Sequence, residues 1–330
     1  MTPLHRLAAY SGGLLLLLLA YQSLWGPAAW VYNDRALVSP LIPSLVNGRP
    51  LAAATWAMTE TPMAARLLNL LLHAGNVLLV VLLARRIGLS EMVATAAAFA
   101  WMVHPMQVET VAYAAGRSEL LAATGVLIAA LAALANGRGW GLWAVVGVGL
   151  GLASKESAIV ALGLIPLVRV AVGHAWRLTG AVCGLAVLAG VAWFGGPTGI
   201  IERELYSTHV SMLDWLLLQA TATARLAWLA LVPIGQTLDF DYDLIPVGVR
   251  ALCVVALLGM TWLAWSLRRS APLVAVGLAW MLIAVLPRLV VQTPRSYLNE
   301  HQFYVPLLGL AIVAGDGLQR WARGYGRVCG

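Results

Sequence analysis

Residues 104–119 read HPMQVETVAYAAGRSE, a polar stretch that lies between two long apolar runs. Pro105 suits the first turn of a helix, because the N–H group that proline lacks would have no partner there. In a continuous helix Glu109, Tyr113 and Arg117 would recur every four residues and share one face. Charged side chains beside a membrane are costly unless they bind something. The stretch therefore predicts one helical face that carries a ligand-binding set.

The composition around this stretch is that of an integral membrane protein. Hydrophobic residues make up 61% and charged residues 11% of the 330 residues, and the mean hydropathy is +0.83. Soluble domains contain about 45–50% apolar and about 25% charged residues. We therefore expect an all-α polytopic fold of about 10–11 transmembrane helices. It would form a single transmembrane domain over residues 1–330, with no soluble domain.

The excess of basic over acidic residues indicates that the partner of the chain is a bilayer rather than nucleic acid. The net charge of +7 comes from 21 Lys and Arg residues against 14 Asp and Glu residues. Most basic residues lie in short loops, which is typical of orientation signals and of contacts with anionic lipids. Cys183, Cys253 and Cys329 are isolated in the sequence. Neither a disulfide framework nor a zinc site is expected from them.

The apolar runs predict where the helices lie. Single runs occur at about residues 7–25, 64–83, 90–103, 120–135, 178–195, 214–232, 249–267, 271–287 and 303–318. The tract 140–168 would be about 43 Å long as one helix, which exceeds a bilayer core of about 30 Å. We therefore expect two shorter helices there, and they meet near Lys155.

Arginine pairs predict the orientation of the chain. Arg85 and Arg86 end the second run, so the positive-inside rule places them in the cytoplasm. The long first loop (26–63), the second loop (104–119) and Lys155 then face outward.

Simple alternation of the later spans leads to a contradiction. It places Arg268 and Arg269 outside, although an arginine pair is typical of the cytoplasmic side. Either one run between residues 178 and 232 does not cross fully, or these arginines are functional. Both possibilities are open at this point.

The first outer loop carries a candidate general base. Asp34 follows Asn33 near the outer end of the first span. A lone carboxylate in this place can accept the proton of an acceptor hydroxyl. The alternative is a solvated loop acid or a helix cap. Further along the loop, residues 50–58 predict a short interfacial helix that Trp56 anchors.

Two loops supply candidate phosphate ligands. Arg117 can hold a phosphate with its two-pronged guanidinium group, with His104, Glu109 and Glu119 beside it. The alternative for this set is a solvated loop or an internal Glu–Arg pair. Lys155 can neutralise a lipid-linked phosphate as a point charge. The alternative for Lys155 is an ordinary short loop or a structural ion pair between helices.

Other polar residues leave more than one interpretation open. Arg225 lies in an apolar run and can bind a phosphate, pair with an acid of a neighbouring helix, or extend to the interface. Asn69 and His73 share a helix face, where interhelical hydrogen bonds are expected. The alternating acids of residues 239–243 can hold a divalent metal, or form a solvated loop. A further polar group can act as topology signals or join the same anionic site: Arg288, Arg295, Glu300 and His301.

Several motifs together resemble those of membrane O-mannosyltransferases that carry tetratricopeptide repeats, and of their bacterial relatives. The motifs are residues 103–122 (VHPMQVETVAYAAGRSELLA), 68–74 (LNLLLHA) with Asn76, 154–157 (SKES) and 299–306 (NEHQFYVP), with residues 233–242 as a further match. They occur in the order that the family has and cover nearly the whole chain. The repeat domain that follows the last span in the family is not expected here.

This resemblance implies a C-type (GT-C) glycosyltransferase. It implies a multi-span helical fold in the bacterial inner membrane, with the active site on the periplasmic face. The donor would be a polyprenyl-phosphate-linked, mannose-like hexose, and transfer to a protein or glycan would invert the anomeric carbon. The first outer loop of the family bears paired acids, one of which is the base. This chain has Asn33 and Asp34 there, so only Asp34 carries over.

The resulting hypothesis gives each polar residue a role. Asp34 takes the proton of the acceptor, and Arg117, Lys155 and Arg225 hold the donor phosphate. Residues in supporting roles are His104, Glu109, Glu119, Glu156, Glu300 and His301. No cofactor is certain from the sequence, and a divalent metal is possible but has no support from it. A transporter or flippase of polyprenyl-linked or other anionic lipids is the alternative. A non-catalytic scaffold that binds a lipid phosphate is a further one, motivated by Asn33.

Overall fold

The structure is a computed structural model. It describes residues 2–26, 49–137, 139–175, 177, 179–184, 186, 211–237, 240–242, 245–290 and 299–328. Within these ranges every regular element is helical, as the sequence predicts. Three helical segments are long and apolar enough to cross a membrane, namely Pro62–Arg86, Ala114–Ala133 and Val247–Leu267. The described chain therefore has the helix lengths and composition of a membrane protein.

Most of the helices follow the predicted runs within a few residues. The longer ones are α1 (Pro3–Ala20), α5 (Pro62–Arg86), α6 (Glu91–Met102), α8 (Arg117–Ala133), α9 (Trp140–Leu152), α10 (Ala161–Ala171), α13 (Met212–Leu231), α14 (Val247–Leu267), α15 (Pro272–Val290) and α16 (Tyr304–Val328). The short ones are α4 (Pro50–Ala57), α7 (Gln107–Ala112), η1 (Gln22–Trp25), η2 (Ala114–Gly116), η3 (Glu156–Val160) and η5 (Glu300–Phe303). The short helix expected at residues 50–58 is confirmed as α4, and its place at an interface stays a prediction. Much of the run 178–195 lies outside the described residues.

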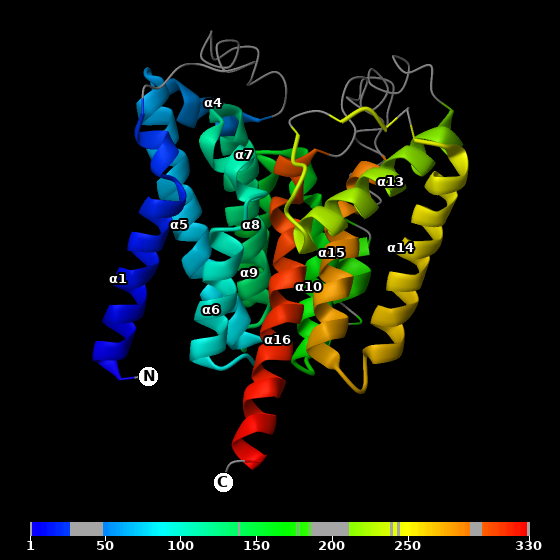
Figure 1. The fold of residues 1–330 in the computed structure, drawn as a ribbon. Coiled ribbons are helices and arrows are strands. Elements are labelled where there is room, and N and C mark those ends of the chain that lie inside the picture. Colours follow the sequence, from blue (N-terminus) through cyan, green and yellow to red (C-terminus); the bar gives the residue numbers. More distant parts are fainter. Residues whose placement is uncertain are drawn as a thin grey trace.

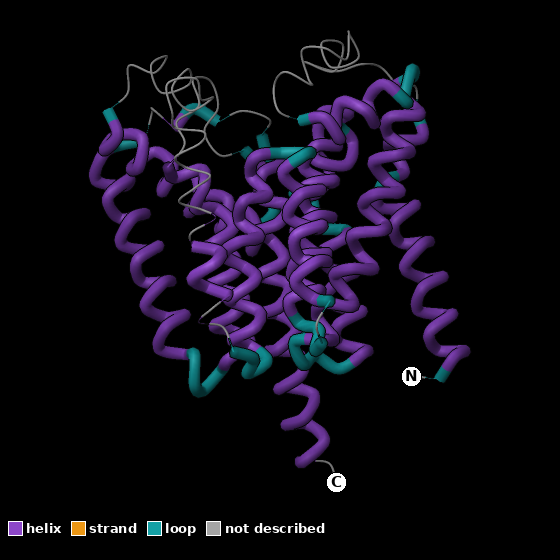
Figure 2. The backbone as a smooth tube through the Cα atoms, turned by 180° about the vertical axis from the view of Figure 1, so that it is seen from behind, coloured by secondary structure: helices purple, strands orange, loops and turns teal. Residues whose placement is uncertain are grey.

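The long helices stand side by side, and the two ends of the bundle differ. Figure 1 shows both chain termini on the lower side, where α1 begins and α16 ends. The short helices α4 and α7 lie on the opposite side. The view from behind in Figure 2 shows the same arrangement. We call the side with α4, α7 and η5 the polar end, and the side with the two termini the terminal end.

The path of helix α13 bears on the contradiction over orientation. It slants through the polar half of the bundle, and the chain after it returns to the polar end before α14 begins (Figure 1). A hydrogen bond from His104 Nε2 to the Ala230 carbonyl (3.1 Å) ties the last turn of α13 to the second loop. This path favours the alternative in which one run between 178 and 232 does not cross fully. Arg268 and Arg269 then lie at the terminal end with Arg85 and Arg86 (Figure 1).

Glycines allow two helix pairs to approach closely. A methyl group on Gly125 of α8 would overlap the backbone of Gly147 and Gly151 in α9. In the same way, a methyl group on Gly277 of α15 would overlap the carbonyl oxygen of Gly309 in α16. Small residues allow membrane helices to pack closely. Apolar side chains alone favour contact with another helix little more than contact with lipid.

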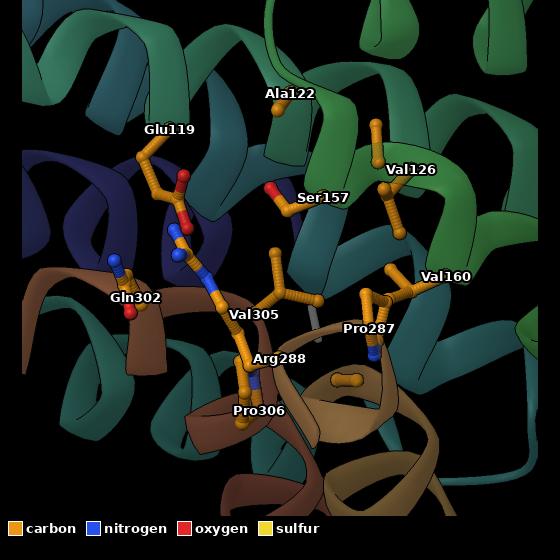
Figure 3. A pocket seen from close by; sticks show the side chains of 12 residues that line it. Glu119, Ala122, Val126, Ser157, Val160, Pro287, Arg288, Gln302, Val305 and Pro306 are labelled. Atoms are coloured by element: carbon orange, nitrogen blue, oxygen red, sulfur yellow. The ribbon is translucent and has the colours of Figure 1, made fainter. Parts of the chain in front are cut away.

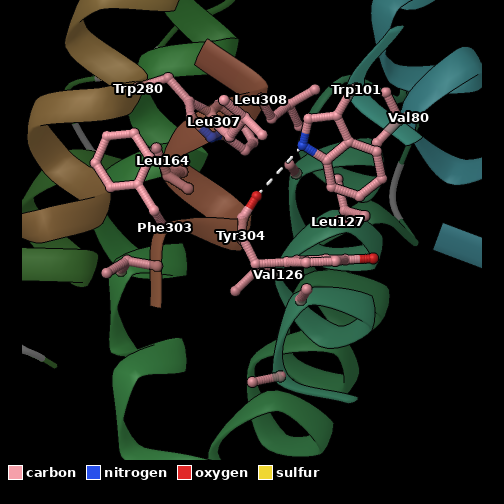
Figure 4. Close-up of a cluster of buried hydrophobic side chains, with 14 of the residues drawn as sticks. Val80, Trp101, Val126, Leu127, Leu164, Trp280, Phe303, Tyr304, Leu307 and Leu308 are labelled. Carbon is pink, nitrogen blue, oxygen red and sulfur yellow. Dashed lines mark hydrogen bonds between the residues drawn. The ribbon is translucent and has the colours of Figure 1, made fainter. Parts of the chain in front are cut away.

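The core joins α5, α6 and α16 through aromatic and polar side chains. Trp101 Nε1 donates to the Tyr304 carbonyl (3.3 Å), as the dashed line in Figure 4 marks. His73 is fully buried and lies 2.7 Å from the Tyr304 hydroxyl and 3.0 Å from the Met102 carbonyl. The carbonyl can only accept, so His73 Nε2 donates to it and Nδ1 accepts from Tyr304. The interhelical hydrogen bonds expected of His73 are thus confirmed.

Candidate functional site

The polar stretch 104–119 is not one helix. Helix α7 ends at Ala112, and Tyr113 is extended, with φ −93° and ψ 128°. Asn69 Nδ2 donates to the carbonyls of Val111 (3.2 Å) and Tyr113 (2.8 Å) at this break. A methyl group on Gly116 would overlap the Thr110 carbonyl, so the chain folds back tightly. The prediction that Glu109, Tyr113 and Arg117 share one face is therefore wrong.

Arg117 is fully buried and its donors are directed at protein groups. Nε donates to Asn69 Oδ1 (3.0 Å), and Nη1 donates to the Thr55 carbonyl (2.7 Å) and to Thr59 Oγ1 (2.9 Å). Nη2 donates to the Ala65 carbonyl (3.1 Å). These bonds fix α4 and the start of α5 against α8. They favour a structural role, and the phosphate-binding role of Arg117 stays a prediction.

Lys155 forms a buried ion pair at the break between two short helices, as the sequence predicts for this tract. Its Nζ lies 2.6 Å from Glu119 Oε2, and each side chain is 6% exposed. That oxygen accepts no hydrogen bond of good geometry, so the contact is mainly electrostatic. Burial lowers the pKa of Lys155, and the charge of Glu119 opposes this shift. The loop thus holds a cation close to one carboxylate in a buried environment.

Glu156 joins the same loop to the first outer loop. Arg49 Nη2 donates to Glu156 Oε1 (2.8 Å) and Arg49 Nε donates to Oε2 (3.1 Å), which is a two-pronged contact. Beside it, Leu51 N donates to the Ala153 carbonyl (2.9 Å). Desolvation alone would raise the pKa of Glu156, but the charges of Arg49 and Lys155 outweigh it and hold the pKa at about 2.

The predicted general base precedes these contacts in the chain. Asp34 belongs to residues 27–48, which lie outside the described residues. Arg49 is the next described residue of the first outer loop, and it lies beside the Lys155 break.

A small cavity of about 20 Å³ opens beside the buried ion pair, between α8, η3, α15 and the start of α16 (Figure 3). Its polar lining consists of Glu119, Ser157, Arg288 and Gln302. The apolar lining consists of Ala122, Val126, Ala158, Val160, Ala284, Pro287, Val305 and Pro306. A volume of this size suits about one water molecule. Figure 3 shows the guanidinium group of Arg288 pointing toward the Glu119 carboxylate.

Arg288 brings a second cation to this carboxylate. Its charge lowers the pKa of both Lys155 and Glu156, so it lies within electrostatic reach of the two. The sequence predicts Arg288 as a topology signal or as part of an anionic site, and it gives no role to Arg49. The signal for Arg288 is the proline and arginine that close an apolar run. Arg49 gives no such signal, because its partner lies 107 residues away.

A second polar group ties η5 to α7 and to the segment after α13. His301 Nδ1 lies 2.8 Å from Glu109 Oε1, and His301 N donates to Glu109 Oε2 (2.9 Å). Glu300 Oε1 accepts from Thr237 N (2.9 Å). Burial raises the pKa of Glu300, with a smaller contribution from Glu109. These contacts bring Glu109, Glu300 and His301 together, and burial lowers the pKa of His104 nearby.

Arg225 belongs to this second group rather than to the Lys155 pair. Its Nη2 donates to the Gly235 carbonyl (3.0 Å), and its guanidinium carbon lies 4.1 Å from the centre of the Phe240 ring. Arg225 therefore holds the returning chain after α13. The donor-phosphate role predicted for it stays a prediction.

The described residues offer little support for a metal centre. No three His, Cys, Asp or Glu side chains of the described chain lie close enough together to hold an ion. Of the alternating acids in residues 239–243, Asp241 is described, and Asp239 and Asp243 lie outside the described residues.

Comparison with known protein families, with curated proteins and with solved structures finds no match for this chain.

Proposed function

We propose that this chain is a GT-C-like membrane glycosyltransferase. It takes a mannose-like hexose from a polyprenyl-phosphate-linked donor and transfers it to a protein or glycan acceptor at the polar end. The observation that carries the proposal is the pair of cations, Lys155 and Arg288, around the buried Glu119 carboxylate. The walls of the cavity beside them are mainly apolar.

The reaction that this arrangement serves is a displacement at the anomeric carbon. The acceptor oxygen forms a bond to that carbon while the bond to the phosphate oxygen breaks with its electron pair. The departing polyprenyl phosphate gains negative charge, which Lys155 and Arg288 stabilise. The proton of the acceptor hydroxyl passes to a general base, and Asp34 is our candidate for it. The displacement as written needs no further reactant.

The location of the site supports the same proposal. The arginine-rich terminal end is typical of the cytoplasmic side, so the polar end would face the periplasm of a bacterial inner membrane. Arg49 belongs to the same first outer loop as Asp34 and contacts Glu156 next to Lys155. This loop therefore reaches the proposed phosphate site at Arg49.

The test is transfer by the purified full chain in proteoliposomes. The probes are radiolabelled polyprenyl-phosphate mannose and a serine-rich and threonine-rich peptide, with separate measurement of polyprenyl phosphate binding. Asp34→Asn should lose transfer by at least about a hundredfold and retain binding. Lys155→Met should lose both. Arg250→Gln, a change of a polar-end arginine on α14, should leave both unchanged.

Equal transfer by wild type, Asp34→Asn and Lys155→Met would refute the site assignment. Binding of polyprenyl phosphate without transfer by the wild type would favour the scaffold alternative.

A transporter of anionic lipids is the second candidate, and interrupted helices favour it. Transporters build substrate sites where helices are broken near the middle of the membrane. Here the tract 140–168 is broken at Lys155, and α13 spans only part of the bundle. Movement of fluorescent polyprenyl phosphate across the same proteoliposomes, without sugar transfer, would support this candidate over the enzyme.

A further inference from the structure

The terminal end of the bundle carries many arginines and few acids. The described arginines there are Arg85, Arg86, Arg169, Arg177, Arg268, Arg269, Arg320 and Arg323. The acids of the described chain at this end are Glu91 and Asp316, and each lies beside an arginine. A strong positive charge therefore remains on this side after the internal pairs are formed.

Tryptophans accompany these arginines. The guanidinium carbon of Arg169 lies 4.2 Å from the centre of the Trp140 ring, and that of Arg268 lies 3.8 Å from the Trp265 ring. Trp321 is 67% exposed between two arginines of α16. Tryptophan prefers the interface between bilayer and water, where its ring is apolar and its N–H can meet polar groups. The terminal end thus carries the types of side chain that are typical of the layer where lipid headgroups lie.

Helix α16 extends this charged surface beyond the bundle. Gln319 closes the turn between α5 and α6, because its Oε1 accepts from Ser90 N (2.6 Å) and its Nε2 donates to the Gly88 carbonyl (3.3 Å). Past Gln319 the helix continues to Val328 and projects from the other helices (Figure 1). At 1.5 Å per residue this projection is about 13 Å long. Arg320 and Arg323 lie on its first turn.

Three of the arginines are exposed and have no ion-pair partner among the described residues. They are Arg86 at the end of α5, Arg269 after α14, and Arg323 on the projection of α16. They come from three separate elements, so no single loop accounts for them. Guanidinium groups match phosphate geometry with two parallel hydrogen bonds.

We infer that these arginines and tryptophans form a docking surface for the headgroups of anionic phospholipids in the adjacent leaflet. The negative surface of a cytoplasmic leaflet attracts basic residues next to the membrane. The inference is independent of the proposed transfer reaction, since it concerns the opposite end of the bundle. We call this set the arginine collar.

The experiment counts lipids retained by the full chain. The wild-type protein is reconstituted in vesicles of phosphatidylcholine with about 25% phosphatidylglycerol, which have an anionic surface. It is then extracted, and native mass spectrometry measures the lipids that stay bound. The test variant is Arg86→Gln with Arg269→Gln and Arg323→Gln, none of which removes a described ion pair. The control is Arg66→Gln with Arg250→Gln, at the polar end.

Wild type and control should retain phosphatidylglycerol in preference to phosphatidylcholine, and the triple variant should lose this preference by about threefold or more. Raising salt from about 0.1 M to about 1 M should have a similar effect, because the Debye length falls from about 10 Å to about 3 Å. Equal preference in all three proteins would overturn the inference. So would an equal loss in the control, or a wild-type dimer that the triple variant cannot form.

Discussion

The two ends of the bundle use charge in opposite ways. The described polar end has as many acids as bases: Glu60, Glu109, Glu119, Glu156, Asp214, Asp241 and Glu300 against Arg49, Arg66, Arg117, Lys155, Arg225, Arg250 and Arg288. Several of these charged side chains are buried and form ion pairs or hydrogen bonds with residues of other helices or loops. The terminal end has mainly exposed arginines. Buried charges must match specific partners, whereas exposed ones act together through their field.

This difference predicts which end tolerates substitution. Removing one partner of a buried pair leaves the other charge without compensation, which is strongly destabilising. Exposed ion pairs are worth little, because water and salt screen them. The polar end should therefore respond to single changes and the terminal end only to combined ones.

The largest effect is expected from Lys155→Met. Glu119 then keeps a 6% exposed carboxylate without its closest cation, so we expect a loss of about 3–5 kcal/mol in the free energy of unfolding. The double variant Lys155→Met with Glu119→Gln removes both charges and should recover much of this loss. Chemical unfolding in detergent measures all four proteins of the cycle. Additive losses from the two changes would show that the pair is not coupled.

A smaller effect is expected from breaking the contact between Arg49 and Glu156. The two side chains are 34% and 58% exposed, so Arg49→Glu should cost about 1 kcal/mol or less. The exchanged pair, Arg49→Glu with Glu156→Arg, should restore stability and, if the proposed reaction holds, transfer. Transfer that stays low in the exchanged pair despite restored stability would show that the two residues do more than hold the loop.

The pH dependence of stability probes the same contact. The pKa of Glu156 is about 2 in the folded chain against an ordinary value of 4.5. A depressed carboxyl pKa stabilises the fold above the ordinary value, and this contribution is lost as the pH falls toward 2. We expect the thermal midpoint of wild type to fall more than that of Glu156→Gln between pH 4.5 and pH 2. Parallel curves for the two proteins would contradict the assignment.

The sequence predicted the helices well because hydrophobic runs depend on local composition. The break at Lys155 and helix α4 follow from length and proline alone. The break at Tyr113 could not be predicted, since it depends on the amide of Asn69, which lies in a different helix. The arginine pairs left open that one run between 178 and 232 does not cross fully, and the slanted path of α13 favours this alternative.

The polar residues were predicted as a group, but their pairing was not. Glu109 faces His301 and Arg117 faces Asn69, although the sequence placed Glu109 and Arg117 on one face. Which distant side chain meets which depends on packing between helices, and spacing along one helix does not contain that information. Arg49 was missed as a site residue for the same reason, whereas Arg288 was predicted either as a topology signal or as part of the anionic site.

The smallest effect is expected at the terminal end. Arg86→Gln, Arg269→Gln and Arg323→Gln should each change the free energy of unfolding by less than about 0.5 kcal/mol, because exposed charges away from buried contacts contribute little. Unfolding in neutral detergent measures this without anionic lipid. A loss as large as that of Lys155→Met in any one variant would mean that the arginine collar contains buried pairs, and the contrast between the two ends would fail. Small single effects together with the loss of lipid preference in the triple variant would show that this end acts through its summed charge.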